Sequence, residues 1–291
     1  MATDTAPTAP GRADAYRAAT RAGVRITPLR GGDVGRALEV LDAIWGPAIR
    51  PTEDFLRALT HAGAALLAAE PLETPVTVCG YVLGFLGWQD GVHLHSHQLG
   101  VLPAYRARGV GYALKLAERA ECLGRGITRM RWTFDPLLAR NAAFNFGKLG
   151  VVATGYVPDL YGRMSDVVNG DDATDRFEVV WSLDADPGPP PVPQGRPAED
   201  AALIEVDGDG VPHRTDTPVR PGVRVPIPAD YDALRRSGAP LGRRWRRVAG
   251  DVFAECFAAG LLASSFGPDG YRFTDAGTVR EPNTNEEGDA R

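Results

Sequence analysis

Three of the five histidines in the chain stand at alternate positions of one short segment. His93, His95 and His97 are separated by single residues, so in a β-strand their side chains point to the same face. The imidazole pKa of about 6.5 suits such a side chain to accept a proton near neutral pH. The pattern therefore predicts a general base. A polar, partly exposed strand is the alternative, as is a metal site, although alternate strand positions do not easily bring all three imidazoles to one ion.

A glycine-containing loop follows this segment and opens a helix. In the run from Arg106 to Gly111, Gly109 and Gly111 leave the backbone accessible, and the first N–H groups of a helix are unpaired. Together with the helix dipole they form an anion site that a pyrophosphate fits, and Arg106 and Arg108 add positive charge. A tight turn without a ligand is the alternative. The spacing matches neither a Walker loop nor a Rossmann fingerprint.

Arg106-Ala-Arg-Gly-Val-Gly111, preceded by Val-x-Pro-x-Tyr-Arg, resembles the Arg/Gln-x-x-Gly-x-Gly/Ala signature of the GNAT N-acetyltransferases. Residues 141–150 resemble that family's second motif, Asn-x-x-Ala-x-x-x-Tyr-x-x-Leu-Gly-Phe, and residues 159–181 resemble an uncharacterised, longer branch of it. The resemblance implies a mixed α/β fold with a central sheet, flanking helices and a strand that splays from its neighbour. It also implies acetyl-CoA or another acyl-CoA as co-substrate, no metal, and the following cofactor-binding residues: Leu99, Gly100, Val101, Arg106, Ala107, Arg108, Gly109, Val110, Gly111 and Asn141.

The catalytic residues follow from the same resemblance. Arylalkylamine N-acetyltransferases have a His-x-His pair at this offset before the signature arginine, which corresponds to His95 and His97 and is implicated in taking the proton from the amine. Where many members have a tyrosine that protonates the leaving thiolate, this chain has Phe146. Tyr161 is the predicted replacement. Tyr156 and unassisted departure of the thiolate are the alternatives.

The predicted reaction is direct attack of a neutral amine on the thioester, without an acyl-enzyme, with the oxyanion held by a backbone N–H near residues 99–101. The expected acceptor is a small molecule such as an amino acid or an aryl amine. Acylation of a protein or peptide and a non-catalytic acyl-CoA sensor are the alternatives.

Composition narrows the remaining possibilities. The net charge is −5 and the arginines are scattered, which excludes nucleic acid as an expected partner. No apolar run is long enough to span a membrane, and the N-terminus lacks the pattern of a signal peptide. Three well separated cysteines indicate a reducing compartment, so we expect a cytoplasmic protein, with a homodimer as one possible assembly.

The order of predicted elements gives the fold class. Strands at 24–28, 76–86, 93–101, 129–134, 151–157 and 177–183 alternate with helices, which argues for a mixed α/β sheet. Strands at 201–206 and 223–227 and two helices within 229–260 form a small C-terminal extension. The predicted ranges are a disordered N-terminus (1–23), a GNAT domain (24–185), a Pro-rich linker (186–198), an extension that packs on the core (199–275) and a disordered tail (276–291).

Overall fold

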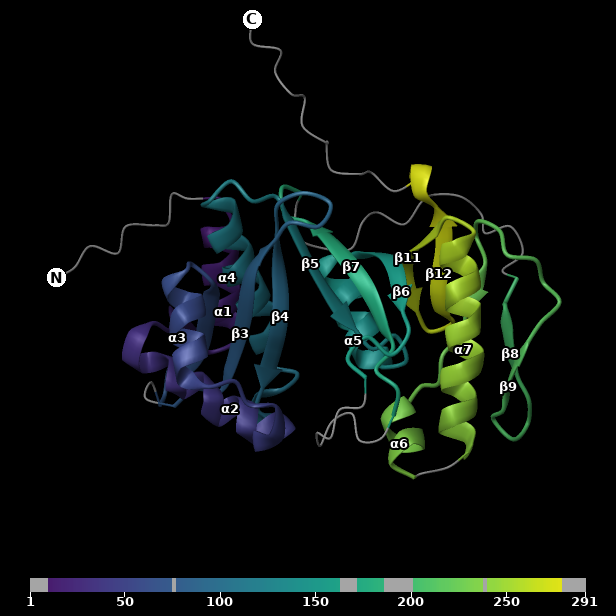
Figure 1. Cartoon of the computed structure of the whole chain (residues 1–291), viewed down its shortest axis with the longest axis horizontal. Helices are drawn as coiled ribbons and strands as arrows, with labels where there is room; N and C mark the ends of the chain where they lie inside the picture. Colours follow the sequence, from purple (N-terminus) through teal and green to yellow (C-terminus); the bar gives the residue numbers. More distant parts are fainter. Residues whose placement is uncertain (1–9, 75–76, 163–171, 186–200, 238–239, 279–291) are drawn as a thin grey trace, which may run out of the picture. The chain divides into compact units, whose positions relative to one another are not determined.

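The computed structural model describes residues 10–74, 77–162, 172–185, 201–237 and 240–278 (Figure 1). Its contacts divide the chain into two compact units, and each is described by itself. The first unit comprises residues 1–133, 161–174 and 183–186, and the second comprises residues 134–160, 175–182 and 187–291. Both contain helices and strands, which confirms the mixed α/β class. The predicted domain ranges remain predictions.

The first unit is built on a sheet with the strand order β1-β2-β3-β4-β5. Neighbouring strands are antiparallel except β4 and β5, which are parallel. Short 3₁₀ turns at 31–34, 47–49 and 103–105 connect some of the elements. The elements are α1 (Arg12–Arg21), β1 (Val24–Pro28), α2 (Gly35–Trp45), α3 (Glu53–His61), β2 (Ala65–Pro71), β3 (Gly80–Gly87), β4 (His93–Val101), α4 (Val110–Leu123) and β5 (Arg129–Phe134), whose last residue belongs to the second unit.

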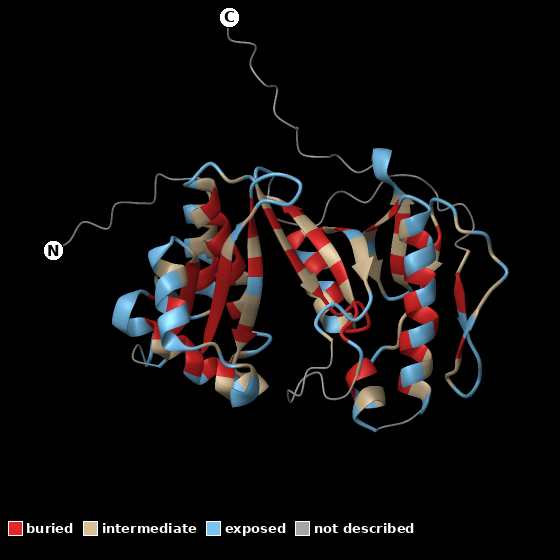
Figure 2. Ribbon diagram, viewed as in Figure 1, coloured by how far each residue is buried: buried red, intermediate tan, exposed pale blue. Residues whose placement is uncertain are grey.

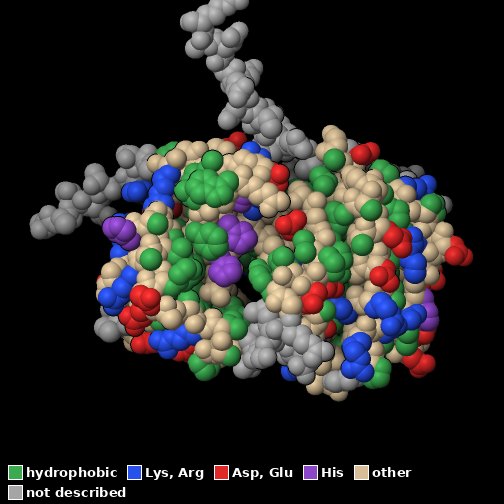
Figure 3. Space-filling model, in the orientation of Figure 1, with side chains coloured by type: hydrophobic (Ala, Val, Ile, Leu, Met, Phe, Trp, Pro, Cys, Tyr) green, Lys and Arg blue, Asp and Glu red, His purple; other side chains and the backbone are tan. Residues whose placement is uncertain are grey.

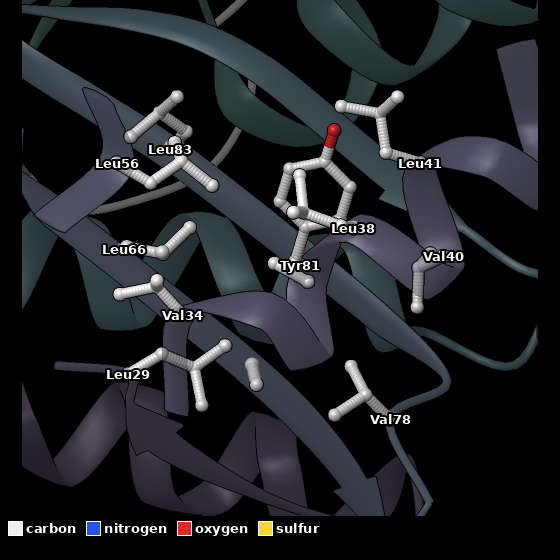
Figure 4. Close-up of a cluster of buried hydrophobic side chains, with 12 residues drawn as sticks. Leu29, Val34, Leu38, Val40, Leu41, Leu56, Leu66, Val78, Tyr81 and Leu83 are labelled. Carbon is white, nitrogen blue, oxygen red and sulfur yellow. The ribbon is translucent and has the colours of Figure 1, made fainter. Parts of the chain in front are cut away.

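Apolar side chains from α2, α3, β2 and β3 pack into one cluster of this unit. Leu38 and Leu41 of α2 meet Tyr81 and Leu83 of β3, and all four are at most 3% exposed (Figure 4). In Figure 2 the buried residues of this unit form stripes along its strands and on one side of its helices. Burial of a side chain of this size contributes about 1.5–3 kcal/mol, so the cluster fixes the sheet that carries β4.

The N-terminal segment corrects one prediction. Residues 12–21, expected to be disordered, form α1, which packs on α4 and β1. Ala18 and Ala19 are its buried residues. Because alanine is the strongest helix former and its small side chain allows close packing, this helix needs no pattern of large apolar residues. That is why the sequence pattern did not reveal it.

The strands of the second unit lie in the order β7-β6-β11-β12-β10, and neighbouring strands in this order are antiparallel. The C-terminal strands therefore extend the sheet of β6 and β7, and β8 and β9 pair separately. The elements are α5 (Ala139–Phe144) continued by a π-helical turn (Asn145–Leu149), β6 (Val152–Val157), β7 (Arg176–Ser182), β8 (Ile204–Val206), β9 (Pro212–Arg214), β10 (Arg224–Val225), α6 (Tyr231–Arg236), α7 (Pro240–Ala258), β11 (Leu261–Gly267) and β12 (Gly270–Asp275).

Aromatic rings and one ion pair form the core of the second unit. The ring of Phe177 lies 4.6 Å from that of Phe253 and 5.1 Å from that of Tyr271, measured between centroids. The Arg246 guanidinium donates to both carboxylate oxygens of Asp135, at 2.8 and 2.7 Å. Both side chains are at least nine-tenths buried, so α7 is fixed to the residues that follow β5.

Two predicted segments fall largely on residues that are not described. The Pro-rich linker at 186–198 lies wholly outside the described residues. Of the tail predicted to be disordered, residues 276–278 form a 3₁₀ turn, which corrects that prediction there, and residues 279–291 lie outside the described part of the chain.

Candidate active site

The three histidines lie on one face of β4, which we call the histidine face. The rings of His95 and His97 are 6.0 Å apart between centroids, and the ring of Phe85 on β3 lies 5.3 Å from the first and 5.6 Å from the second. His95 is half-buried, His97 is exposed, and His93 is buried with Nδ1 2.9 Å from the carbonyl oxygen of Gly91. Figure 3 shows histidine side chains next to apolar ones. The strand thus brings His95 and His97 together beside an aromatic ring.

The pKa values of both members of this pair are lowered, which favours the neutral imidazole at physiological pH. Burial lowers the pKa of His95 to about 4, and the positive charges of His97, His93, Lys115 and Arg131 add to the shift. Partial desolvation also lowers the pKa of His97, although its side chain remains exposed to solvent. Neutral imidazoles can accept a proton, but a base with so low a pKa is weak. The pair is therefore suited to an amine that arrives already neutral, or to proton removal through water.

β4 separates from β5 after His95. The two strands pair only at Leu94 with Met130 and at His95 with Arg131 among the described residues. From Ser96 to Val101, β4 pairs with β3 alone. Leu99, Gly100 and Val101 lie in this stretch, so the backbone groups that point away from β3 form an open strand edge next to the histidines. Such an edge can pair with an extended ligand arm that carries amide groups.

The loop after β4 has the backbone geometry of an anion site. Gly109 has φ 89° and forms the N-cap of α4 without any side-chain cap, and Ala107 also has a positive φ, of 60°. Only glycine adopts this conformation without strain. Val110 is buried in the first turn of α4, and a Cβ atom placed on Gly111 would meet only the Leu99 and Val101 side chains at ordinary van der Waals distance. The helix therefore begins without a side-chain cap on its first N–H groups, as at helix starts that hold a pyrophosphate.

The two arginines of the loop differ in what they contact. Arg106 is exposed and its Nε donates to the carbonyl oxygen of Val101 at 3.1 Å, which ties the loop to the end of β4. The Arg108 guanidinium lies 5.4 Å from the centre of the Tyr105 ring. Both side chains remain exposed at the start of α4, where a phosphate would gain charge-assisted hydrogen bonds.

The tyrosine positions separate the candidate acids. Tyr161 Oη lies 3.2 Å from Thr133 Oγ1, and Thr133 is two residues beyond Arg131, the β5 residue paired with His95. Because side chains alternate along a strand, Tyr161 reaches the histidine face of the first unit. Tyr156 belongs to the second unit and donates to Asp175 at 2.6 Å; burial and this carboxylate raise its pKa. Tyr161 thus remains the candidate acid.

Phe146 and Asn141 both belong to the second unit. Phe146 is 3% exposed and its ring packs on Tyr271, with 5.6 Å between centroids, so it is a core residue there. Asn141 is half-buried on α5. The structure brings together His95, His97, Leu99 to Val101, the loop and Tyr161 within the first unit, whereas Asn141 is placed in the other one.

Sequence reasoning missed a buried charged group on the other side of β4. Ser96 donates to Glu118 of α4 at 2.7 Å, and Lys115 of α4 donates to the same carboxylate at 3.2 Å. The pattern of α4 suggests Ala113, Leu114, Ala117 and Ala120 as its buried side, so its charged residues look like part of a solvated face. The spacing of Lys115 and Glu118, three residues apart as helix neighbours, was the available signal.

Two absences concern the described residues alone. Within them, no group of three or more His, Cys, Asp or Glu side chains is arranged to hold a metal ion. No helix among them is both long and apolar enough to cross a membrane.

The fold and the loop define a mixed α/β domain in which a strand that separates from its neighbour leads through a glycine loop into a helix. Residues 39–150 match the model of the acetyltransferase (GNAT) family. This match confirms, for that part of the chain, the resemblance seen in the sequence.

Solved structures add similarity of a lower degree. A ribosomal-protein-S18-alanine N-acetyltransferase from Escherichia coli is 14% identical with a TM-score of 0.43, over 55% of this chain and 94% of that one. An Arabidopsis thaliana NAA60 in complex with acetyl-CoA is 16% identical with a TM-score of 0.42, over 55% and 99% of the two chains. An IAA acetyltransferase from Bacillus cereus is 13% identical with a TM-score of 0.42, over 55% of this chain and 99% of that one. No curated protein matches the chain. Likeness of this degree assigns no substrate.

Proposed function

We propose that this protein is an acyl-CoA-dependent N-acyltransferase that acylates the amino group of a small molecule. The observation that carries the proposal is the course of β4, which presents His95 and His97 on one face, opens away from β5 after His95 and leads into the glycine loop of α4. A proton acceptor, an edge for an extended thioester substrate and a site for its phosphates thus follow one another along a single stretch of chain.

The residues of the first unit divide the reaction between them. The loop residues 106–111 hold the phosphates of acyl-CoA, and the open edge at 99–101 aligns the thioester arm. The amine nitrogen forms a bond to the acyl carbon while the carbon–sulfur bond breaks, and the electron pair leaves on sulfur. The proton lost by the amine goes to His95 or His97, directly or through water, and the thiolate takes a proton from Tyr161.

The histidine face favours a weakly basic acceptor. The Phe85, His95 and His97 rings lie within 5.3–6.0 Å of one another and present flat, uncharged surfaces at neutral pH. An aryl amine is uncharged under these conditions and stacks on such rings, whereas an alkyl ammonium must first lose a proton to a weak base. We therefore propose aryl amines as the preferred small-molecule acceptors, over amino acids and alkyl amines.

The cellular location of the protein and the limits of its domains are proposals as well. Cys79, Cys122 and Cys256 are free and buried, which is compatible with a reducing compartment and supports a cytoplasmic location. We retain residues 24–185 as the proposed acyltransferase domain and residues 199–275 as its extension.

Thiol release tests the proposed function. Acetyl-, propionyl- and succinyl-CoA are offered with aryl amines, alkyl amines, amino acids and peptides, and the wild type is compared with Gly111→Asp and with its uncharged match Gly111→Asn. The aspartate places a negative charge at the helix start and abolishes turnover, whereas the asparagine variant keeps a large part of it. If only peptides are acylated, the proposal of a small-molecule acceptor is overturned. If acyl-CoA binds but no amine is acylated, the proposal of an enzyme is overturned in favour of an acyl-CoA sensor.

A further inference from the structure

β4 contains a bulge at His97. Its residues pair with β3 as Gln98 with Leu83 and Ser96 with Gly84, so the register skips His97. A bulge of this kind inserts one residue and turns two successive side chains to the same face. The contacts agree with this: Gln98 accepts a hydrogen bond from Tyr81 on β3 at 3.0 Å, while the His97 ring packs on Phe85 of the same strand.

The bulge determines to which face of the sheet the His95 side chain points. If pairing continued from Leu83 and Gln98 without the bulge, Leu86 would oppose His95, and Phe85 would oppose Ser96. A shift of one residue exchanges the faces of every side chain in the shifted part of a strand. His95 would then turn toward α4 and Ser96 toward the histidine face. The active-site geometry therefore depends on the bulged register.

A buried charged cluster from α4 lies under this point of the strand. The Ser96 hydroxyl donates to Glu118 Oε2 at 2.7 Å, and Lys115 Nζ donates to that oxygen at 3.2 Å and also to Ser96 Oγ. Lys115 Nζ lies 4.0 Å from the centre of the Trp132 ring. Ser96 is 5% exposed, Lys115 2% and Glu118 0%. The cluster is thus formed only when Ser96 faces α4.

The second oxygen of the carboxylate meets the opposite strand. Glu118 Oε1 has no hydrogen-bond partner among the described residues, and a Cβ atom placed on Gly84 would lie 2.4 Å from it. The carboxylate therefore occupies the space that a side chain at position 84 would need. Since Gly84 pairs with Ser96 next to the skipped residue, one carboxylate contacts both strands at the bulge.

Stability alone does not account for such a cluster. A buried ion pair gains little net free energy, and apolar residues of similar volume are often as stable or more so. Buried polar groups are best attested as devices that select one register. We propose that Lys115, Glu118 and Ser96 act together as positioning residues that hold the bulged register of β4 and so keep His95 and His97 on the open face; their effect on turnover rests on the function proposed above.

The test replaces the charges with apolar residues of similar size. Lys115→Met with Glu118→Leu is compared with the wild type and with Leu116→Met, a volume-conserving change at a buried position of the same helix. The double variant is expected to fold but to lose kcat by about tenfold or more, with KM for acetyl-CoA unchanged, because a displaced catalytic group mainly affects the chemical step. Leu116→Met is expected to leave both constants unchanged.

Nuclear Overhauser effects read the register without any need for turnover. In the wild type and in Leu116→Met, Gly84 shows backbone contacts to Ser96, and the Phe85 ring shows contacts to His95 and His97. In the double variant the Gly84 contacts are expected to move to His97, and the Phe85–His95 contacts to weaken. If the double variant does not fold, Ser96→Ala, which removes only the link to the strand, serves in its place.

The outcomes separate the two proposals. Wild-type kcat together with wild-type contacts in the folded variant overturns the positioning role. If the register moves in the double variant but the wild type acylates no amine, the proposed function is overturned. The positioning role is supported in that case, because the contacts show it without turnover. An unchanged register with reduced kcat also overturns the positioning role, since the cluster would then act on turnover by another route.

Discussion

The two units each bury an ion pair, and the two pairs are completed to different degrees. In the second unit, Arg246 contacts Asp135 through two parallel hydrogen bonds, and Asp135 also accepts from the Leu137 N–H at 3.0 Å. In the first unit, Glu118 accepts from Lys115 and Ser96 through one oxygen and leaves the other without a hydrogen-bond partner within the described part of the chain. The complete pair, named for a carboxylate whose two oxygens both accept hydrogen bonds, joins elements of a core, whereas the incomplete one, whose carboxylate is bonded through one oxygen, lies beneath a bulged strand that carries catalytic candidates.

This difference extends to the surroundings of each pair. The incomplete pair lies beneath the strand that carries His95 and His97, whose pKa values are lowered, and the loop with Gly109 follows that strand. A positive φ at Asp159 and register shifts in β6 and β11 occur in the second unit as well, so the histidines and the loop distinguish the first unit, and strain does not. We therefore expect changes in the second unit to alter mainly stability, and changes in the first unit to alter mainly binding and turnover.

The largest effect is expected for the complete pair. Arg246→Leu leaves the Asp135 carboxylate buried and uncompensated, and loss of one partner from a buried pair costs about 3–5 kcal/mol. Urea unfolding measures the change. Arg57→Ala is the control: it removes an exposed ion pair with Glu53, 3.0 Å long, and is expected to change the free energy of unfolding by no more than about 0.5 kcal/mol. A loss below about 1 kcal/mol for Arg246→Leu would contradict a structural role for this pair.

The next effect concerns the two tyrosines. Tyr161→Phe removes the proposed proton donor to the thiolate and is expected to lower kcat on the order of 10²-fold without changing KM for acetyl-CoA. Tyr156→Phe removes the hydrogen bond to Asp175 in the second unit, and is expected to cost about 1 kcal/mol of stability while kcat stays the same. Steady-state kinetics and urea unfolding of both variants test this. If Tyr161→Phe retains wild-type kcat, the thiolate leaves without a protein acid.

The parts of the fold that were predictable are those with local signals. The run from His93 through Gly111 shows strand alternation, a proline and then two glycines, so strand, loop and helix start were all visible in the sequence. By contrast, all seven residues of β2 are buried, and its sequence of Ala, Leu, Glu and Pro shows no alternation. The hairpin of β11 and β12 does have a local signal, because Pro268-Asp-Gly270 forms a turn between two alternating segments.

The site was predictable in its residue types and not in its register. Alternation correctly placed His93, His95 and His97 on one face, yet it cannot show that Gln98 follows on that same face, since a bulge depends on pairing with β3. The contact between Ser96 and Glu118 was not predictable either, because Glu118 is 22 positions away and reaches Ser96 only through helix packing. The lowered pKa of His95 also depends mainly on burial, a tertiary property.

A smaller effect is expected from the glycines of the loop. Gly109 has φ 89°, and alanine in a left-handed conformation costs about 1–2 kcal/mol, so Gly109→Ala should reduce stability by this amount and weaken acetyl-CoA binding about tenfold. Gly111→Ala is the matched control, because its new Cβ atom would have no neighbour closer than 3.7 Å. Calorimetric titration and thermal unfolding measure both. Equal effects of the two changes would contradict a requirement for the left-handed conformation at Gly109.

The smallest effect is a shift in the titration of His95. Its pKa of about 4 in the folded protein lies below the value of about 6.5 in an unfolded chain. The unfolded state therefore binds the proton first, and stability falls as the pH decreases from about 6.5 to about 4, while the folded imidazole stays neutral and able to accept a proton over that range. His97→Ala removes one neighbouring charge and admits water, so it should raise the pKa of His95 toward 6.5. Two-dimensional NMR of the imidazole Cε1–H groups measures this, with His95→Gln to assign the signal. A wild-type His95 that titrates near pH 6.5 would show that the histidine face is as hydrated as ordinary surface. The acceptor would then not have to be a weakly basic amine, and alkyl ammonium ions would become the expected substrates.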